Sequence, residues 1–116
     1  MGKYKVVFHI DENTKSKANV VFGNILNLIS DLGDENVEVE LVANSEGVLI
    51  FQKGLEWHSE KITKLKQKNV KIIACENSLR QIGITKDSLF DNVDIVPAGV
   101  SEIVKKQAEG WAYIRP

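Results

Sequence analysis

The chain has 116 residues and a mass of 13.0 kDa, and 43% of its residues are hydrophobic and 27% charged. These proportions are typical of one globular domain, which we expect to span residues 1–116. The 15 basic and 16 acidic residues leave a net charge of −1, which gives no electrostatic reason to expect a nucleic acid or an anionic membrane as a partner.

The single cysteine, Cys75, excludes an internal disulfide and a Cys-x-x-Cys metal or redox pair, and it suits a reducing compartment. No segment approaches the ~20 continuous apolar residues of a membrane span. The N-terminal segment lacks the apolar core and cleavage site of a secretory signal. We therefore expect a cytoplasmic protein.

The first half of the chain alternates strand and helix patterns. Residues 4–10 predict a buried strand, apolar residues at helical spacing predict a helix over 15–32, and alternating apolar residues predict a strand over 37–43. A turn at 44–47 precedes the apolar run 48–51, which fits a buried helical turn, a pocket wall or a subunit contact. Because exposed apolar patches mark interfaces, this run is our candidate oligomer contact.

The second half continues the alternation. It predicts a weakly amphipathic helix over 56–68, a strand over 70–74 that Cys75 closes, and a broken helical region over 77–90 interrupted at Gly83. A strand over 93–96, a turn at Pro97 and Gly99, and a helix over 101–109 that Gly110 ends come next. Residues 111–114 predict a short strand at a sheet edge.

Five strands with interposed helices predict an α/β fold with a mostly parallel sheet covered on both faces. In such folds, ligands bind beyond the carboxyl ends of the strands. This rule selects the segments 9–13, 44–47, 75–80 and 97–100 as one functional rim.

Cys75 lies on this rim, at the end of a strand and at the start of a helix. Unpaired backbone N–H groups and the helix dipole favour the reactive thiolate there. We expect Asn77 and Ser78 to cap the helix and Arg80 to add positive charge, all of which lower the pKa of the thiol, whereas burial raises it. The alternative is that Cys75 only packs, because free cysteines are among the most buried residues.

Each of the other polar residues of the rim fits both a structural role and a functional role. His9 fits a satisfied core or rim histidine, or else a proton shuttle or orienting partner for the thiol, with Asp11 fixing its tautomer. Asn44 and Ser45 fit a turn or a pocket wall. A hydrolase that uses Cys75 and His9 lacks a recognisable third member.

The sequence predicts no cofactor and no metal. It contains no GxGxxG after the first strand and no GxxxxGK[ST], and its two histidines are not spaced as metal ligands. The aromatic, basic tail of Trp111, Tyr113 and Arg115 fits docked edge structure or a subunit contact better than a base-stacking platform. We therefore expect no nucleic acid and no membrane as partners.

The cysteine count also limits the sulfur chemistry. Without a second cysteine, an oxidised Cys75 cannot close an internal disulfide. Sulfur chemistry must leave a persulfide, a sulfenic acid or a bond to another molecule. A protein that takes sulfur from one partner and gives it to another fits this constraint.

Five segments of the chain match the sequence pattern of a known family, namely residues 6–11, 43–48, 74–80, 97–100 and 107–116. The match over 107–116 is the most specific of the five. In these segments, and over nearly its whole length, the chain resembles the DsrE/DsrF-like family in its small single-domain branch. The resemblance implies a three-layer α/β/α fold with a five-stranded sheet and assembly as trimers or hexamers. It also implies persulfide relay through a cysteine at the position of Cys75.

Our leading hypothesis is a homo-oligomeric sulfur-relay protein, either a sulfurtransferase or a sulfur carrier, that works with sulfur-donor and sulfur-acceptor proteins. Cys75 would accept a sulfane sulfur and pass it on, and the backbone amides over 77–80 would stabilise the anion. His9, Asp11, Asn44, Ser45 and Gly99 would line the pocket. The alternative is a non-catalytic small-ligand-binding module or a structural oligomer component in which Cys75 only packs.

Overall fold

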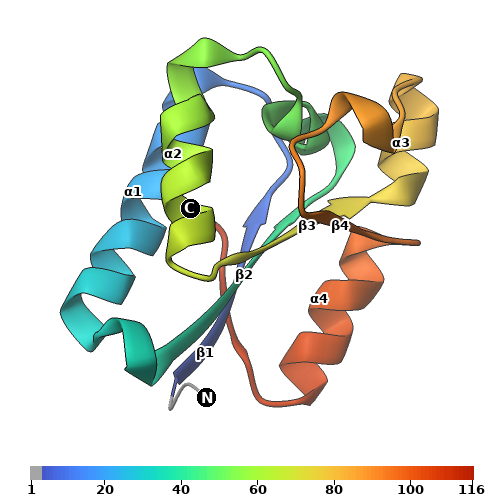
Figure 1. Ribbon diagram of the computed structural model, residues 1–116. Helices are drawn as coiled ribbons and strands as arrows, with labels where there is room; N and C mark the ends of the chain where they lie inside the picture. The colour runs from blue at the N-terminus through green and yellow to red at the C-terminus, as the bar shows by residue number, and fades with distance from the viewer. Residues whose placement is uncertain (1–3) are drawn as a thin grey trace.

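The structure, a computed structural model, describes residues 4–116, and of Glu56 it describes the backbone alone. The first three residues, which belong to the expected domain and to the N-terminal segment, lie outside the described residues. The strands are β1 (Tyr4–Ile10), β2 (Val37–Ala43), β3 (Lys71–Cys75), β4 (Val93–Val96) and β5 (Ala112–Ile114). They form one sheet in the order β4-β3-β2-β1-β5, and each pairing is parallel (Figure 1). The expected α/β fold is confirmed, and its sheet is entirely parallel.

The helices are α1 (Lys15–Leu32), α2 (Glu56–Gln67), α3 (Glu76–Ile82) and α4 (Gly99–Ala108), with 3-10 turns η1 (Asp34–Asn36), η2 (Ser45–Phe51) and η3 (Lys86–Ser88). The chain steps from β1 to β4 in one direction, so right-handed crossovers place α1, α2 and α3 on one face of the sheet. The return to β5 runs in the opposite direction, and α4 therefore covers the other face (Figure 1). Within residues 4–116, no helix has the length and apolarity needed to cross a membrane.

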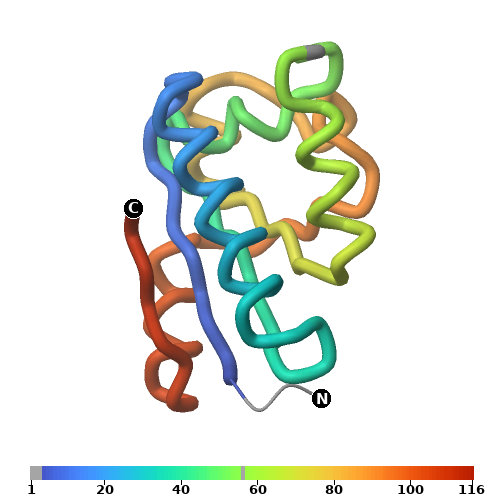
Figure 2. The backbone as a smooth tube through the Cα atoms, turned by 90° about the vertical axis from the view of Figure 1, so that its left-hand side faces the viewer, coloured from blue at the N-terminus to red at the C-terminus, as the bar shows by residue number. Residues whose placement is uncertain are grey.

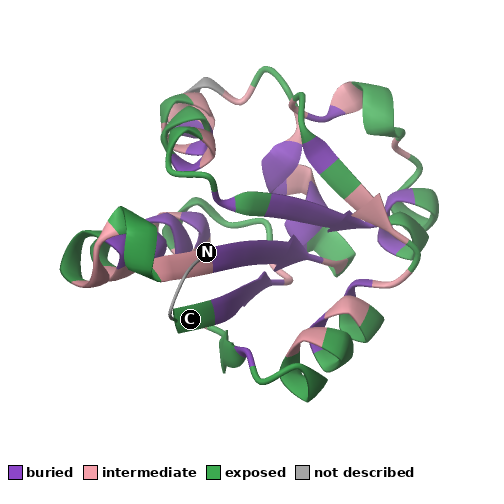
Figure 3. Cartoon of the chain, turned by 60° about the horizontal axis from the view of Figure 1, so that its bottom comes forward, coloured by how far each residue is buried: buried purple, intermediate pink, exposed green. Residues whose placement is uncertain are grey.

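The two faces of the sheet bury two cores of unequal size. Strand alternation points Phe8 and Leu41 towards α1 and α2, into the larger core. The smaller core under α4 consists of Val7, Val42, Ile73, Ile103 and Trp111. Buried residues accordingly concentrate in the central strands, while the outer faces of the helices are exposed (Figure 3).

The apolar run 48–51 does not form the exposed patch expected of a subunit contact. Val48, Ile50 and Phe51 lie in η2 and are fully buried in the larger core. Gly47 makes this inward turn possible, because a Cβ at that position would lie only 2.3 Å from the carbonyl oxygen of Ile10. The interface expected at this run was therefore wrong, and the buried-turn reading is confirmed.

Most predicted boundaries agree with the structure, but two helices begin earlier. Helix α3 begins at Glu76 with Cys75 as its N-cap residue, and α4 begins at Gly99 rather than at Ser101. The predicted edge strand is confirmed as β5, which runs beside β1 (Figure 2). The break at Gly83 is also confirmed, because this residue ends α3 with a left-handed φ of 88°.

Candidate functional site

The ends of β2 and β3 meet the start of α4 at the predicted rim. A Cβ at Gly99 would lie 3.3 Å from Cys75 Cβ, 3.2 Å from Asn44 Cβ and 3.3 Å from a methyl of Val42. Gly99 therefore packs directly between Cys75 and Asn44, and a side chain at this position would require its neighbours to move by a few tenths of an ångström. The segments that contain Asn44, Cys75 and Gly99 therefore lie together, as the sequence predicted.

The Cys75 sulfur is nearly covered, yet its surroundings are polar. The residue is 5% exposed. Burial raises the pKa of the thiol, but the Ser78 hydroxyl and the backbone N–H groups of Gly99, Ser78 and Asn77 outweigh it, so the pKa lies below its ordinary value. The Cys75 side chain makes no cap hydrogen bond at the start of α3. The site favours a thiolate.

Ser78 connects the sulfur to the turn after β2. Its Oγ accepts a hydrogen bond of 2.6 Å from the backbone N–H of Ser45. Ser78 lies one helical turn after Cys75, and its hydroxyl is one of the groups that lower the pKa of the thiol. Ser45 reaches this position through a left-handed φ of 51°.

Two sequence expectations about the helix start were wrong. Asn77 and Ser78 do not cap α3 with their side chains, because Cys75 itself is the N-cap residue. The exposed Arg80 guanidinium donates to Asn77 Oδ1 at 2.7 Å and is not among the groups that shift the pKa of Cys75. On α3, Arg80 lies five positions after Cys75 and bonds back along its own helix. The sulfur is therefore stabilised by neutral donors rather than by a cation.

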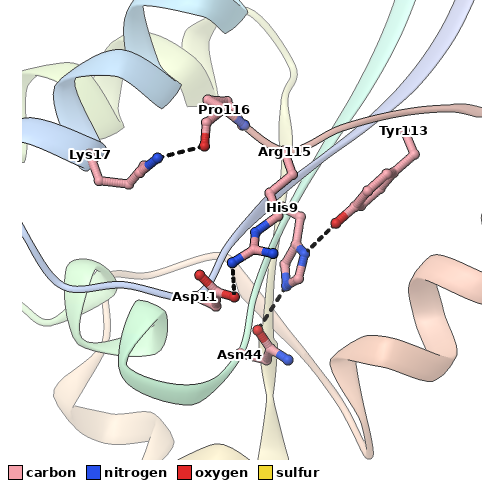
Figure 4. A network of polar contacts seen from close by, with 7 residues as sticks. All are labelled: His9, Asp11, Lys17, Asn44, Tyr113, Arg115 and Pro116. Atoms are coloured by element: carbon pink, nitrogen blue, oxygen red, sulfur yellow. Dashed lines mark hydrogen bonds and ion pairs between the residues drawn. The ribbon is translucent and has the colours of Figure 1, made fainter.

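His9 does not act directly on the sulfur. Its Nε2 lies 2.8 Å from Asn44 Oδ1 and its Nδ1 lies 2.7 Å from the Tyr113 hydroxyl, so both ring nitrogens are engaged (Figure 4). Strand β2 separates β1 from β3, which places the two backbones about 10 Å apart. His9 is therefore hydrogen-bonded to Asn44 and Tyr113 rather than to Cys75, and Asn44 lies between His9 and the cysteine.

Asp11 also has a different partner from the one expected. Its carboxylate forms an ion pair of 2.8 Å with Arg115 rather than a bond to His9 (Figure 4). Asp11 lies directly after the end of β1, two residues beyond His9, and its carboxylate bonds the segment after β5. The His9 tautomer is instead set by Asn44 and Tyr113.

Sequence reasoning placed Tyr113 and Arg115 in edge structure but missed their contacts with the rim. Both lie more than 100 positions from their partners, His9 and Asp11. The contacts arise because β5 pairs with β1 in parallel, with Tyr113 opposite Val7. The only signal in the sequence is the aromatic and basic character of the tail, and its target depends on strand order.

A second buried polar cluster lies under α4. Glu40 of β2 is 2% exposed, and one of its carboxylate oxygens has no hydrogen-bond partner. Lys106 Nζ lies 3.5 Å from Glu40 and 3.8 Å from Glu102. Burial, followed by the hydrogen bond and charge of Glu102, raises the pKa of Glu40 to about 7, although Lys106 and Lys71 oppose the shift. Within the described residues, no group of His, Cys, Asp and Glu side chains is arranged to hold a metal ion.

The chain is similar to two solved structures. MTH1491 from Methanobacterium thermoautotrophicum, described as a protein of unknown function, is 44% identical with a TM-score of 0.91, and the match covers 97% of this chain and 99% of that one. The ychN protein from E. coli is 16% identical with a TM-score of 0.80 over the whole of both chains, a likeness of fold. Among curated proteins, none matches. The family model of the DsrE/DsrF-like family matches residues 3–116, and the chain therefore belongs to the DsrE/DsrF-like family.

Proposed function

We propose that this protein is a sulfur carrier in which the Cys75 thiolate accepts a sulfane sulfur and holds it as a persulfide. The observation that supports the proposal most is the set of neutral donors around the sulfur, which lowers the pKa of the thiol despite burial. A thiolate is the nucleophile in sulfur exchange. The DsrE/DsrF-like family is related to sulfur relay, which agrees with this chemistry.

The transfer balances without an external oxidant. The Cys75 thiolate attacks the outer sulfur of a donor persulfide R–S–SH, a bond forms between Cys75 Sγ and that sulfur, and the donor S–S bond breaks. The products are Cys75–S–SH and the donor thiolate R–S⁻. In the second half of the relay, an acceptor thiolate takes the outer sulfur and Cys75 returns to the thiolate.

The limited exposure of Cys75 restricts the donors that can reach it. A residue that is 5% exposed admits a thin, extended group such as a persulfide terminus more easily than a bulky electrophile. The outer sulfur of the product would extend the reactive atom outward, where an acceptor can meet it. The geometry therefore suits a carrier of single sulfur atoms.

The test is intact-mass measurement after incubation with inorganic polysulfide. The native chain is expected to gain ~32 Da, the mass of one sulfur atom, and Cys75→Ser is expected to gain nothing. Circular dichroism on both proteins verifies that they are folded. A natively folded chain that stays at its original mass, over a range of polysulfide concentrations, would refute the carrier.

A second candidate is a non-catalytic module, for ligand binding or assembly, in which Cys75 only packs. The burial of Cys75 beside the larger core favours it. Alkylation by iodoacetamide as a function of pH distinguishes the two. A slow reaction with a midpoint at or above the free-thiol value of ~8.5 supports the packing role, whereas a lower midpoint supports the carrier.

We also propose that the protein works in the cytoplasm as a homo-oligomer, a trimer or hexamer, with separate sulfur-donor and sulfur-acceptor proteins. Support for assembly comes from α4, where Val100 and Val104 are exposed one helical turn apart. Gly99, beside the sulfur, is the preceding residue on the same helix. Assembly through α4 would therefore lie close to the reactive atom.

A further inference from the structure

Three side chains from three elements form one hydrogen-bonded chain along the rim. The Tyr113 hydroxyl of β5 lies 2.7 Å from His9 Nδ1, and His9 Nε2 lies 2.8 Å from Asn44 Oδ1 (Figure 4). His9 is 8% exposed, so the ring is shielded from water that could replace either partner. We call this the Tyr113–His9–Asn44 chain.

The direction of the hydrogen bonds follows from the chemistry of the atoms. Asn44 Oδ1 can only accept, so Nε2 of His9 must hold a proton. In the neutral ring, Nδ1 is then an acceptor, and the Tyr113 hydroxyl donates to it. Asn44 therefore fixes the neutral tautomer, and Tyr113, whose hydroxyl can donate or accept, holds the ring in this orientation through Nδ1.

Asn44 in turn orients the peptide that bonds Ser78. Its backbone N–H donates to the carbonyl of Ile10, its carbonyl accepts from the N–H of Gly47, and its side chain is fixed by His9. The next amide, Ser45 N–H, donates to Ser78 Oγ at 2.6 Å. Ser78 lies one helical turn after Cys75 at the start of α3, and its hydroxyl is the polar group that lowers the pKa of the thiol most.

The segment after β5 fixes Tyr113 to this rim. Arg115 forms an ion pair of 2.8 Å with Asp11, and Lys17 Nζ of α1 donates to the carbonyl oxygen of Pro116 at 2.6 Å (Figure 4). These contacts join the segment after β5 to the residue that follows β1 and to α1. They add to the three-residue pairing of β5 with β1.

We infer that Tyr113 is a positioning residue for Cys75, acting through His9, Asn44 and Ser45 to keep the Ser78 hydroxyl directed at the sulfur. Tyr113 does not contact the sulfur, and its effect is on how readily Cys75 reacts rather than on the bonds made and broken. The inference rests on the proposed role of Cys75, but it concerns the reactivity of the thiol and can be tested without any sulfur donor.

The experiment is a double-mutant cycle read by the pH dependence of Cys75 alkylation with iodoacetamide. Tyr113→Phe removes one hydroxyl and is expected to slow alkylation at pH 7 by roughly two- to tenfold, the effect of one hydrogen bond, and to move the midpoint to higher pH. Ser78→Ala is expected to slow it at least as much. In the Ser78→Ala background, Tyr113→Phe should have no further effect, because its route to the sulfur is already removed.

Ile114→Val is the matched control, since it changes the adjacent residue of β5 without removing a hydrogen bond, and it should leave the profile unchanged. An unchanged profile for Tyr113→Phe, or slowing that is additive with Ser78→Ala, overturns the inference. If Ser78→Ala does not fold, nitrogen NMR of the His9 ring decides. The native ring should show Nδ1 as a hydrogen-bonded acceptor, and Tyr113→Phe should remove that bond. Loss of this bond with unchanged alkylation would also overturn the inference.

The two proposals fail separately. A chain that alkylates as expected but never gains sulfur refutes the carrier and leaves the positioning role of Tyr113 intact. If Cys75 gains sulfur but the pH dependence of its alkylation is the same in Tyr113→Phe, the carrier proposal stands and the positioning role of Tyr113 is refuted.

Discussion

At Cys75 two effects oppose each other on one sulfur atom. Removal from water disfavours the thiolate, while three backbone amides and one hydroxyl favour it and prevail. The amides come from two helices, since Asn77 and Ser78 belong to α3 and Gly99 to α4. A side chain that packs inertly has no need of donors from both helices, and this convergence is the residue-scale argument for reactivity.

Gly99→Ala tests that convergence. The new methyl group would lie 3.2–3.3 Å from Asn44, Cys75 and Val42, so these side chains or the start of α4 must move by a few tenths of an ångström, and we expect the Gly99 N–H to interact less well with the sulfur. Crowding costs ~1–3 kcal/mol and the loss of a helical glycine returns ~0.5–1 kcal/mol, giving a destabilisation of about 1 kcal/mol. We expect slower alkylation of Cys75 at pH 7 together with this small loss in urea unfolding.

The control for Gly99→Ala is Ser101→Ala, an exposed residue in the first turns of the same helix. It should change neither the alkylation rate nor the stability by a comparable amount. Equal alkylation rates for Gly99→Ala and the native chain would show that the Gly99 amide does not stabilise the thiolate.

At the scale of elements, α4 has an unusual position because it alone covers one face of the sheet. Its N-terminus contacts Cys75, and its other end lies over the buried Glu40. The apolar core beneath it is small, so the polar cluster of Glu40, Glu102 and Lys106 is a substantial part of its contact with the sheet. The docking of α4 should therefore depend on the protonation of that cluster.

The expected pH dependence follows from Glu40, whose pKa is about 7 in the folded chain against 4.5 in the unfolded one. The folded chain binds this proton more tightly, so its stabilising contribution is complete below pH 4.5 and is lost as the pH rises to about 7. The loss amounts to about 1–3 kcal/mol. Glu40→Gln mimics the protonated carboxyl and should gain stability relative to the native chain as pH rises from 5 to 8.

Urea unfolding of both proteins at several pH values measures this difference, and the native-minus-variant comparison removes the contributions of other titrating groups. Glu38→Gln, at a half-buried carboxyl on the same strand, serves as the control. A native-minus-variant difference that stays constant from pH 5 to 8 would contradict the raised pKa of Glu40.

At the scale of the whole molecule, the two most exposed of the large hydrophobic side chains in the described residues lie on α4 rather than at residues 48–51. Val100 is 56% exposed and Val104 is 65% exposed, whereas Val48, Ile50 and Phe51 are fully buried. If the chain assembles with copies of itself, α4 is the element to test. Such an assembly would cover the helix that supplies the Gly99 amide to Cys75.

We expect the native chain to sediment well above 13 kDa at micromolar concentration, and the double variant Val100→Glu, Val104→Glu to sediment as a monomer. Two carboxylates in a desolvated contact disfavour assembly strongly. Val20→Glu, at an exposed valine of α1, should assemble like the native chain. A native chain that sediments at 13 kDa refutes the oligomer.

Local patterns in the sequence were sufficient to predict the elements and the place of Cys75. The periodicity of apolar residues reports which face of a segment is buried, and it marked the five strands and the long helices, with the start of α4 in error by two residues. The carboxyl ends of parallel strands meet at one edge, so the rim also followed from the sequence. Glu40 escaped prediction because alternation along β2 does not reveal that α4 covers its other face.

The sequence by itself determined an α/β fold of the DsrE/DsrF-like family with a lone thiol at the end of its third strand. Only the tertiary structure decided which groups reach that thiol. The strand order places β5 beside β1, which brings Tyr113 to His9 across 104 positions. The return crossover places the Gly99 amide against Cys75. Periodicity is a property of neighbouring residues, whereas these contacts depend on how distant strands pair, and the sheet order is what sets the chemistry of the sulfur.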